Sequence, residues 1–350
     1  MNLFDVIENL VEERGLDKEQ ISHVVCEGLS AAYSKKYPEV DFSISFNKKT
    51  GAAEVCSKKT VVSSVSDANK EISLRKAKSI NPKAKDGMII DVPFDGSIGR
   101  IEILVAKQVI ANKIKELEQS VVYNEYKEQQ ESIISGTIHK KERAGFVVKI
   151  NDVMAILPSE NVIPDENLII GHPIKVLLKE VLPIARGDYQ LILDRTSPDF
   201  VKKLLELEIP EVFEGLVEIK KIVRVAGYKT KAIVVSKGKE IDPVGTCIGV
   251  GGARIKPILK ELGREKIDII EWTDSLEDLV KRSLKPAEID RVDIVDNKVA
   301  TVWLNQDQRS FAIGKMGQNI LLASKLIGLD LQLQDVNPMG GISDSTETES

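Results

Sequence analysis

The sequence predicts a multidomain α+β protein, and three observations lead to that fold class. Apolar residues recur at helical spacing through the first third of the chain. Five short apolar segments then follow one another between residues 133 and 194, with glycine and proline between them. A unit of strand, glycine turn, helix and strand occurs twice before residue 336. A chain of 350 residues can bury a core in each of several such domains.

Composition excludes several classes of protein. The chain carries 49 Lys and Arg against 54 Asp and Glu, a net charge of −5, so it has no strongly basic character. No run of about 18 uncharged apolar residues is present and the first stretch is acidic, so we expect no membrane span, no export signal and a cytoplasmic protein. The 3 cysteines and 3 histidines are too dispersed for a disulfide framework or a zinc site. We therefore expect no metal, no cofactor and no catalysis.

Residues 1–130 are predicted to form a first domain of helices beside a small sheet. Apolar periodicity predicts two amphipathic helices, within residues 3–11 and 21–32. Alternation around Phe42, Ile44 and Phe46, followed by a turn and residues 52–56, predicts a hairpin. A further strand is predicted over residues 88–94, and residues 101–128 read as one long helix with a single apolar face.

Residues 131–197 are predicted to form a small barrel of the OB type. The expected strands cover residues 133–139, 144–150, 153–157, 173–182 and 189–194. Phe146 and Lys140, beside His139, Lys141 and Arg143, are candidate contacts for an oligonucleotide. The alternation by itself favours the simpler interpretation that Phe146 is a core residue.

The most informative feature is an internal repeat. Residues 247–263 align with residues 312–328 at a constant offset of 65, and six of the seventeen pairs are identical. Shared positions include the glycine pairs Gly249/Gly314 and Gly252/Gly317. In each copy a strand precedes the G-x-x-G turn, and a helix and a second strand follow it. Residues 198–284 and 285–336 are therefore predicted to be two related domains, followed by a disordered acidic tail, residues 337–350.

This arrangement is typical of KH domains, which hold about four nucleotides of single-stranded RNA at a G-x-x-G loop. Glycines let a phosphate backbone approach closely, and the helix that follows offers its N-terminal N–H groups to an anion. An ordinary structural turn is the alternative, less favoured because two copies share one context. The candidate RNA-binding residues are Gly249, Val250, Gly251, Gly252, Ala253 and Arg254 in the first copy, and Gly314, Lys315, Met316, Gly317, Gln318 and Asn319 in the second.

Several longer strings resemble the NusA family of bacterial transcription termination and antitermination factors. They include residues 94–101, 106–110, 208–220, 241–249, 265–272 and 312–319, and the resemblance runs from residue 1 to about residue 336. It implies an N-terminal α/β docking domain for RNA polymerase, an S1-type barrel and two type II KH domains that bind nascent RNA. The implied protein is a monomer that modulates pausing, termination and antitermination alongside other such factors, in a short form without C-terminal acidic repeats.

The chain departs from the family pattern at three places. The first loop has Val250-Gly251 where a basic residue is usual, so we expect Arg254 to substitute for it. Lys229 and Lys231 stand where the family usually has an arginine, which keeps positive charge near the RNA without bidentate geometry. The barrel lacks the aromatic and histidine set of strong RNA-binding S1 barrels, so its contribution should be small.

Two functions remain open at this point. The first is a polymerase-bound, RNA-binding elongation factor. The second is a stand-alone RNA-binding module of ribosome assembly or RNA decay, since barrels and KH domains also occur there. Residues 1–130 discriminate between the two, because they resemble a docking domain.

Overall fold

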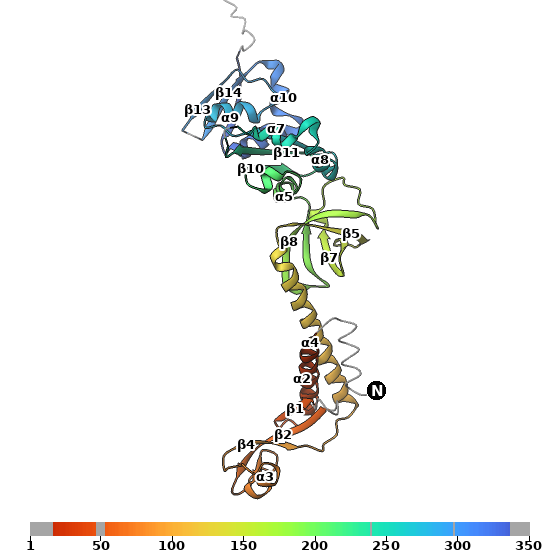
Figure 1. The fold of residues 1–350 in the computed structure, drawn as a ribbon. Coiled ribbons are helices and arrows are strands. Elements are labelled where there is room, and N and C mark those ends of the chain that lie inside the picture. Colours follow the sequence, from red (N-terminus) through yellow and green to blue (C-terminus); the bar gives the residue numbers. More distant parts are fainter. Residues whose placement is uncertain (1–16, 47–52, 239, 297, 337–350) are drawn as a thin grey trace, which may run out of the picture. The chain divides into compact units, whose positions relative to one another are not determined.

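The computed structural model describes residues 17–46, 53–238, 240–296 and 298–336, whose elements are labelled in Figure 1. The chain divides into two compact units. The first lies within residues 1–125 together with Pro183–Ala185, and the second comprises Tyr126–Leu182 and the residues from Arg186 onward. None of the helices in the described ranges has the length and apolar character that a membrane span needs.

The first unit combines helices with a sheet built around β2. Helix α2 (Lys18–Lys36) begins at Asp17, whose carboxylate accepts hydrogen bonds from the backbone N–H groups of Glu19 and Gln20. Strand β2 (Ala53–Val62) pairs antiparallel with β1 (Phe42–Phe46) and β4 (Ile89–Pro93), and parallel with the short β3 (Glu71–Ser73). Helix α3 (Leu74–Ile80) follows β3, and the long α4 covers Arg100–Tyr126.

The predicted hairpin, the strand near residue 90 and the long helix are confirmed in this unit. The predicted helix at residues 3–11 lies outside the described residues. Strand β3 and helix α3 were not predicted, because three and seven residues are too few to show a periodicity. Gly28 of α2 faces α4 so closely that a Cβ there would lie 2.4 Å from Cγ1 of Ile110.

The second unit begins with the predicted five-stranded barrel. Its strands are β5 (Ile133–Lys141), β6 (Gly145–Ile150), β7 (Val153–Pro158), β8 (Pro173–Arg186) and β9 (Tyr189–Asp194). They close in the order β5-β6-β7-β9-β8 around fully buried residues that include Val147, Leu157, Leu178 and Leu191. Tyr126, the last residue of α4, is buried in this unit, and its hydroxyl accepts a hydrogen bond from Nδ2 of Asn151 (3.1 Å).

Two units of the same topology follow the barrel, as the repeat predicted. The first KH unit contains α5 (Pro198–Glu208), α6 (Pro210–Phe213), β10 (Val217–Val225), β11 (Lys229–Ser236), α7 (Pro243–Ile248), α8 (Ile255–Leu262) and β12 (Lys266–Glu271). The second contains α9 (Leu276–Ser283), β13 (Arg291–Val295), β14 (Val299–Leu304), α10 (Arg309–Ile313), α11 (Gln318–Ile327) and β15 (Asp330–Asp335). In each, the central strand pairs antiparallel with the strand before it and parallel with the strand after it.

The two KH units share an apolar contact. One face of the first sheet packs on its own helices through Ala232 and Val234. Its other face places Ile233 and Ile270 against Leu279 of α9 and Leu326 of α11. Helices of the second unit therefore complete the core on the open side of the first sheet.

Buried arginines join the barrel to the first KH unit. The guanidinium of Arg195, 1% exposed, forms ion pairs with Glu166 of the barrel and Glu261 of α8. Arg224 of β10 forms a second, fully buried ion pair with Glu265 (2.8 Å) and donates to the backbone oxygens of Arg195 and Ser197. Charged groups this deeply buried are stable only when paired, which fixes the geometry of this junction.

Candidate nucleic-acid interface

The two G-x-x-G segments adopt the same backbone conformation. Gly249 and Gly314 have φ values of +74° and +71°, and Gly252 and Gly317 have values of +78° and +73°. The third loop residues, Gly251 and Met316, are also left-handed, with φ values of +60° and +54°. Each loop forms a short 3-10 turn between the two helices of its unit. The repeat in the sequence is therefore a repeat in backbone geometry.

The first glycine of each loop is required by packing as well as by φ. A Cβ on Gly314 would lie 2.6 Å from the Cβ of Asn319, and one on Gly249 would lie 2.9 Å from Cγ of Arg254. In contrast, no atom lies within 4 Å of the position that a Cβ would take on Gly251 or Gly317. Each loop therefore packs on the following helix at its first glycine, and there is open space beside Gly251 of the first loop and Gly317 of the second.

The middle of each loop projects into solvent. Val250 is 97% exposed and Met316 is 87% exposed, and Lys315 is exposed beside it. Helix α11 begins directly after the second loop, and α8 begins three residues after the first, so both loops lie at helix N-termini. An anion at the second loop would meet a lysine within the loop and the positive end of a helix dipole. At the first loop it would meet the dipole and the exposed Lys256 of α8, whose Cε lies 3.4 Å from the position of a Cβ on Gly252.

Arg254 and Asn319 were both predicted to bind RNA, but Asn319 is buried, and Arg254, whose side chain is 35% exposed, is engaged in an ion pair. Arg254 forms an ion pair with Glu211 of α6 and donates to the backbone oxygen of Thr246. Asn319 is 3% exposed, and its Nδ2 donates to the backbone oxygens of Leu284, Phe311 and Ala312. The expectation that Arg254 supplies the missing positive charge of the first loop is corrected, because Glu211 neutralises it.

Lys229 and Lys231 also lie in the interior. The ammonium of Lys231 is buried between Asp268 and the backbone oxygen of Ser283, each 2.7 Å away, and burial lowers its pKa. Its predicted place on the RNA surface is wrong, because it joins the two KH units. Lys229, whose side chain is 13% exposed, contacts Asp268 (2.7 Å) and donates to Oδ1 of Asn319 (3.3 Å).

The candidate surface of the barrel lies at the turn between β5 and β6. Phe146 is half-buried, and the Nζ of Lys141 lies 5.3 Å from its ring centroid, so Phe146 lies between the barrel core and the surface. Lys140 is exposed but paired with Glu142 (2.7 Å). Tyr189, which was not predicted, donates its hydroxyl to the same carboxylate (3.0 Å). Only tertiary structure reveals Tyr189 here, because it is 47 residues from Glu142 in the chain.

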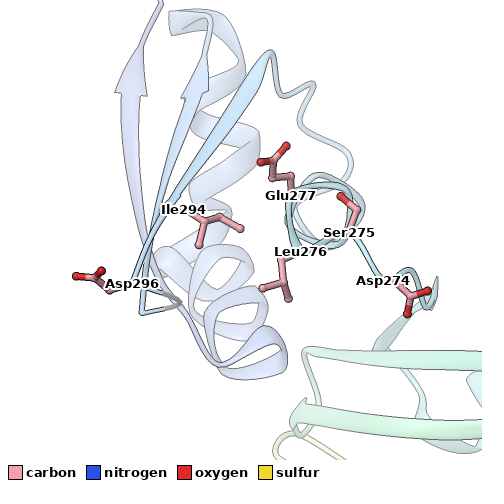
Figure 2. A pocket seen from close by; sticks show the side chains of 6 residues that line it. All are labelled: Asp274, Ser275, Leu276, Glu277, Ile294 and Asp296. Carbon is pink, nitrogen blue, oxygen red and sulfur yellow. The ribbon is translucent and has the colours of Figure 1, made fainter.

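An open hollow lies where α9 begins beside β13, and its chemistry is unsuited to RNA. This open depression of about 520 Å³ is lined by Asp274, Ser275, Leu276, Glu277, Ile294 and Asp296. Figure 2 shows Asp274 and Asp296 on opposite sides, with Glu277 apart from both. Three carboxylates repel phosphate, and across the described residues no cluster of three or more His, Cys, Asp or Glu could hold a metal ion.

Comparisons with known proteins agree along most of the chain. Residues 2–120 match the NusA N-terminal domain, residues 195–272 the NusA-like first KH domain and residues 276–339 the NusA-like second KH domain. The transcription termination/antitermination protein NusA of Halalkalibacterium halodurans is 33% identical over 335 residues, which is 94% of this chain and 87% of that protein. The NusA proteins of Bacillus subtilis and Thermus thermophilus are 33% and 35% identical over 95% of this chain, and over 90% and 89% of their own lengths.

Proposed function

Because the chain belongs to the NusA family of transcription termination/antitermination proteins, we propose that it binds RNA polymerase through residues 1–130 and nascent RNA through its two KH units. Bound in this way, and as a monomer, it modulates pausing, termination and antitermination. The observation that carries the RNA half of this proposal is the pair of loops with equal left-handed geometry. Each of them lies at the N-terminus of a helix.

The two loops hold the RNA backbone unequally in this proposal. At the second loop, Lys315 neutralises a phosphate, while Gly317 and the free N-terminal turn of α11 let the backbone approach. At the first loop, Val250 offers no charge, and the neighbouring Arg254 is already paired with Glu211. The second loop therefore supplies most of the phosphate affinity, and the first mainly shapes the path of the strand.

The barrel adds a smaller contact. The half-buried Phe146 and the exposed Lys141 form an edge on which a base can stack. Lys140 is held by Glu142 and contributes little net charge. We therefore expect the loss of Phe146 to weaken RNA binding less than changes in the second loop do.

The decisive experiment measures the lifetime of a hairpin-stabilised pause of purified bacterial RNA polymerase. The full chain is compared with a chain that starts at residue 121, which keeps Tyr126 with the barrel that it packs in. The proposal expects the full chain to lengthen the pause and the shortened chain to bind RNA without lengthening it. If both chains bind RNA and neither changes the pause, the polymerase role is wrong and the protein is a stand-alone RNA-binding module.

A further inference from the structure

Arg254 and Asn319 occupy equivalent positions of the internal repeat and make equivalent contacts. Each is the fifth residue after the first glycine of its loop, and each packs against that glycine. Arg254 donates to the backbone oxygen of Thr246 (2.9 Å), and Asn319 donates to that of Phe311 (3.2 Å). Thr246 and Phe311 are themselves 65 positions apart. The shared contact ties the start of the second helix to the end of the first, which holds the loop between them in place.

The two residues differ in what supports them from outside the loop. Arg254 is held by Glu211, which belongs to the same KH unit. Asn319 is held by Lys229, which belongs to β11 of the first KH unit, 90 residues earlier in the chain. Asn319 also donates to the backbone oxygen of Leu284, at the end of α9. The second loop is therefore supported partly by its neighbour, and the first is supported within its own unit.

The surroundings of Lys229 hold its ammonium in this place. Asp268 contacts the Nζ atoms of both Lys229 and Lys231 at 2.7 Å, and Lys231 donates onward to the backbone oxygen of Ser283. On the side of the second KH unit, the ammonium of Lys229 donates to Oδ1 of Asn319. With its side chain only 13% exposed, Lys229 has little surface left for a phosphate.

We propose that Lys229 is a positioning residue for RNA binding by the second KH unit. Through Asn319 it holds the Gly314–Gly317 loop in its RNA-binding shape, so this loop is fully formed only when the second unit is docked on the first. This inference rests on the proposed function, because it assumes that the second loop holds RNA. Lys229 and Asn319, which the sequence assigned to direct RNA contact, therefore support the loop that makes the contact.

The salt dependence of RNA affinity tests this role. Lys229→Met removes the hydrogen bond to Asn319, and we expect RNA affinity to fall about five- to tenfold. Each phosphate neutralised on a single strand adds about 0.7 to the slope of log affinity against log salt. A positioning residue leaves that slope unchanged, whereas a residue in contact with phosphate lowers it by about 0.7. Lys315→Met serves as the reference for direct contact, and the exposed Lys325→Met as the control for a lost charge.

Two further variants separate positioning from damage to the fold. Asn319→Ala removes its own hydrogen bonds to the backbone as well as the one from Lys229, so it should weaken binding at least as much as Lys229→Met. The double variant should lose no more than Asn319→Ala alone, since the contact between the two side chains is already absent. Lys229→Arg keeps donors to Asp268 and Asn319 and should bind RNA as the wild type does. The Gly317 amide donates to the backbone oxygen of Gly314 (3.2 Å). Its hydrogen exchange, measured without RNA, should quicken in Lys229→Met and keep the wild-type rate in Lys229→Arg.

The outcomes distinguish this inference from the proposed function. A wild-type chain that fails to bind RNA overturns the proposed function. If the wild type binds RNA and Lys315→Met weakens it while Lys229→Met does not, the function stands and the positioning role is wrong. A slope reduced by about 0.7 in Lys229→Met would likewise reject positioning, since it assigns Lys229 to a phosphate.

Discussion

At the level of single residues, Gly317 offers the sharpest test of the RNA contact. Its φ is +73°, and no atom lies within 4 Å of the position of a Cβ. Asn and Asp both tolerate this left-handed conformation and have nearly the same shape. Comparing the two variants therefore changes only the charge that would face the phosphate in the proposed complex.

We expect Gly317→Asp to reduce RNA affinity at least tenfold and Gly317→Asn to reduce it less than threefold. The cause is repulsion between the new carboxylate and the phosphate at a site where Lys315 and the helix dipole attract one. Filter binding at fixed salt measures both, with the thermal melting of each variant as the control for folding. Equal losses in the two variants would show that the loop does not hold phosphate.

Val250 allows the opposite test, a gain of affinity at the first loop. Its side chain is 97% exposed, and the nearby Arg254 is neutralised by Glu211. Val250→Lys should strengthen RNA binding and steepen the salt slope by about 0.7, because one more phosphate is neutralised. Val250→Gln, similar in length but uncharged, should leave the slope unchanged. If Val250→Lys binds as the wild type does, the first loop lies away from the RNA backbone.

Cys247 precedes the first loop and reports on the packing beneath it. Burial raises the pKa of its thiol to about 11, and the carboxylate of Glu211 adds to the rise. A raised pKa keeps the thiol protonated, so at pH 8 only about one molecule in a thousand carries the reactive thiolate. Mass spectrometry after iodoacetamide treatment should find Cys247 unmodified in the folded chain and modified in urea. Rapid modification of the folded chain would show that the helix α7 opens readily.

At the level of elements, strand β10 depends on a buried ion pair. Arg224 and Glu265 have side chains that are fully buried, and Glu265 also accepts hydrogen bonds from the backbone N–H of Gly227 and the hydroxyl of Thr230. The pair lies where the first KH unit meets the barrel, since Arg224 also donates to the backbone of Arg195 and Ser197. Removing one partner leaves a buried charge without compensation.

Arg224→Met should lower the free energy of unfolding by about 3–5 kcal/mol, as measured by urea denaturation. The matched control is Arg282→Met, which breaks the partly exposed ion pair with Glu271 and should cost less than about 1 kcal/mol. A similar small loss in both variants would mean that water reaches the Arg224 site.

Helices and strands were predicted correctly where they are long and keep a regular hydrophobic period. Long α4 and the barrel strands follow their hydrophobic periods over many residues and were predicted. Strand β10 was missed although it has nine residues, because a register shift between Ile219 and Lys221 breaks its two-residue alternation. Strand β13 was missed because it has only five residues and charged side chains on its open face, at Arg291 and Asp293.

At the level of the whole molecule, the boundary between the two compact units lies next to Tyr126. The contacts of the Tyr126 side chain assign this residue to the second unit. Tyr126 closes α4 but is 2% exposed and hydrogen-bonded to Asn151 of the barrel. The domain boundary that the sequence predicted at residue 130 would separate Tyr126 from the barrel in which its side chain packs. The end of α4 is therefore part of the core of the second unit.

A chain that starts at residue 131 should be less stable than one that starts at residue 121, by about 3 kcal/mol, because it leaves the site of a buried aromatic ring empty. Urea denaturation of the two shortened chains measures the difference, and Tyr126→Phe in the longer one isolates the hydrogen bond to Asn151. That single change should cost about 1 kcal/mol. Equal stability of the two shortened chains would show that Tyr126 does not support the barrel.

The sequence by itself determined the order of the domains, the barrel, the repeat and the two glycine loops. These are local properties, since helical and strand periods, turn glycines and a repeat at a constant offset are all visible within short windows of sequence. The resemblance to the family predicted the function, because several long strings of residues match those of the family.

Tertiary structure alone decided which charged and polar residues near the loops are exposed and which are buried or paired. Arg254, Lys231 and Asn319 stand next to the loops in sequence, or near them by family pattern, yet their partners Glu211, Ser283 and Lys229 come from 43, 52 and 90 residues away. A lysine has the same local sequence signal whether it is solvated or buried beside an aspartate that the fold brings to it. Burial and ion pairing depend on contacts between distant segments, and for that reason the direction of these side chains could not be read from the chain alone.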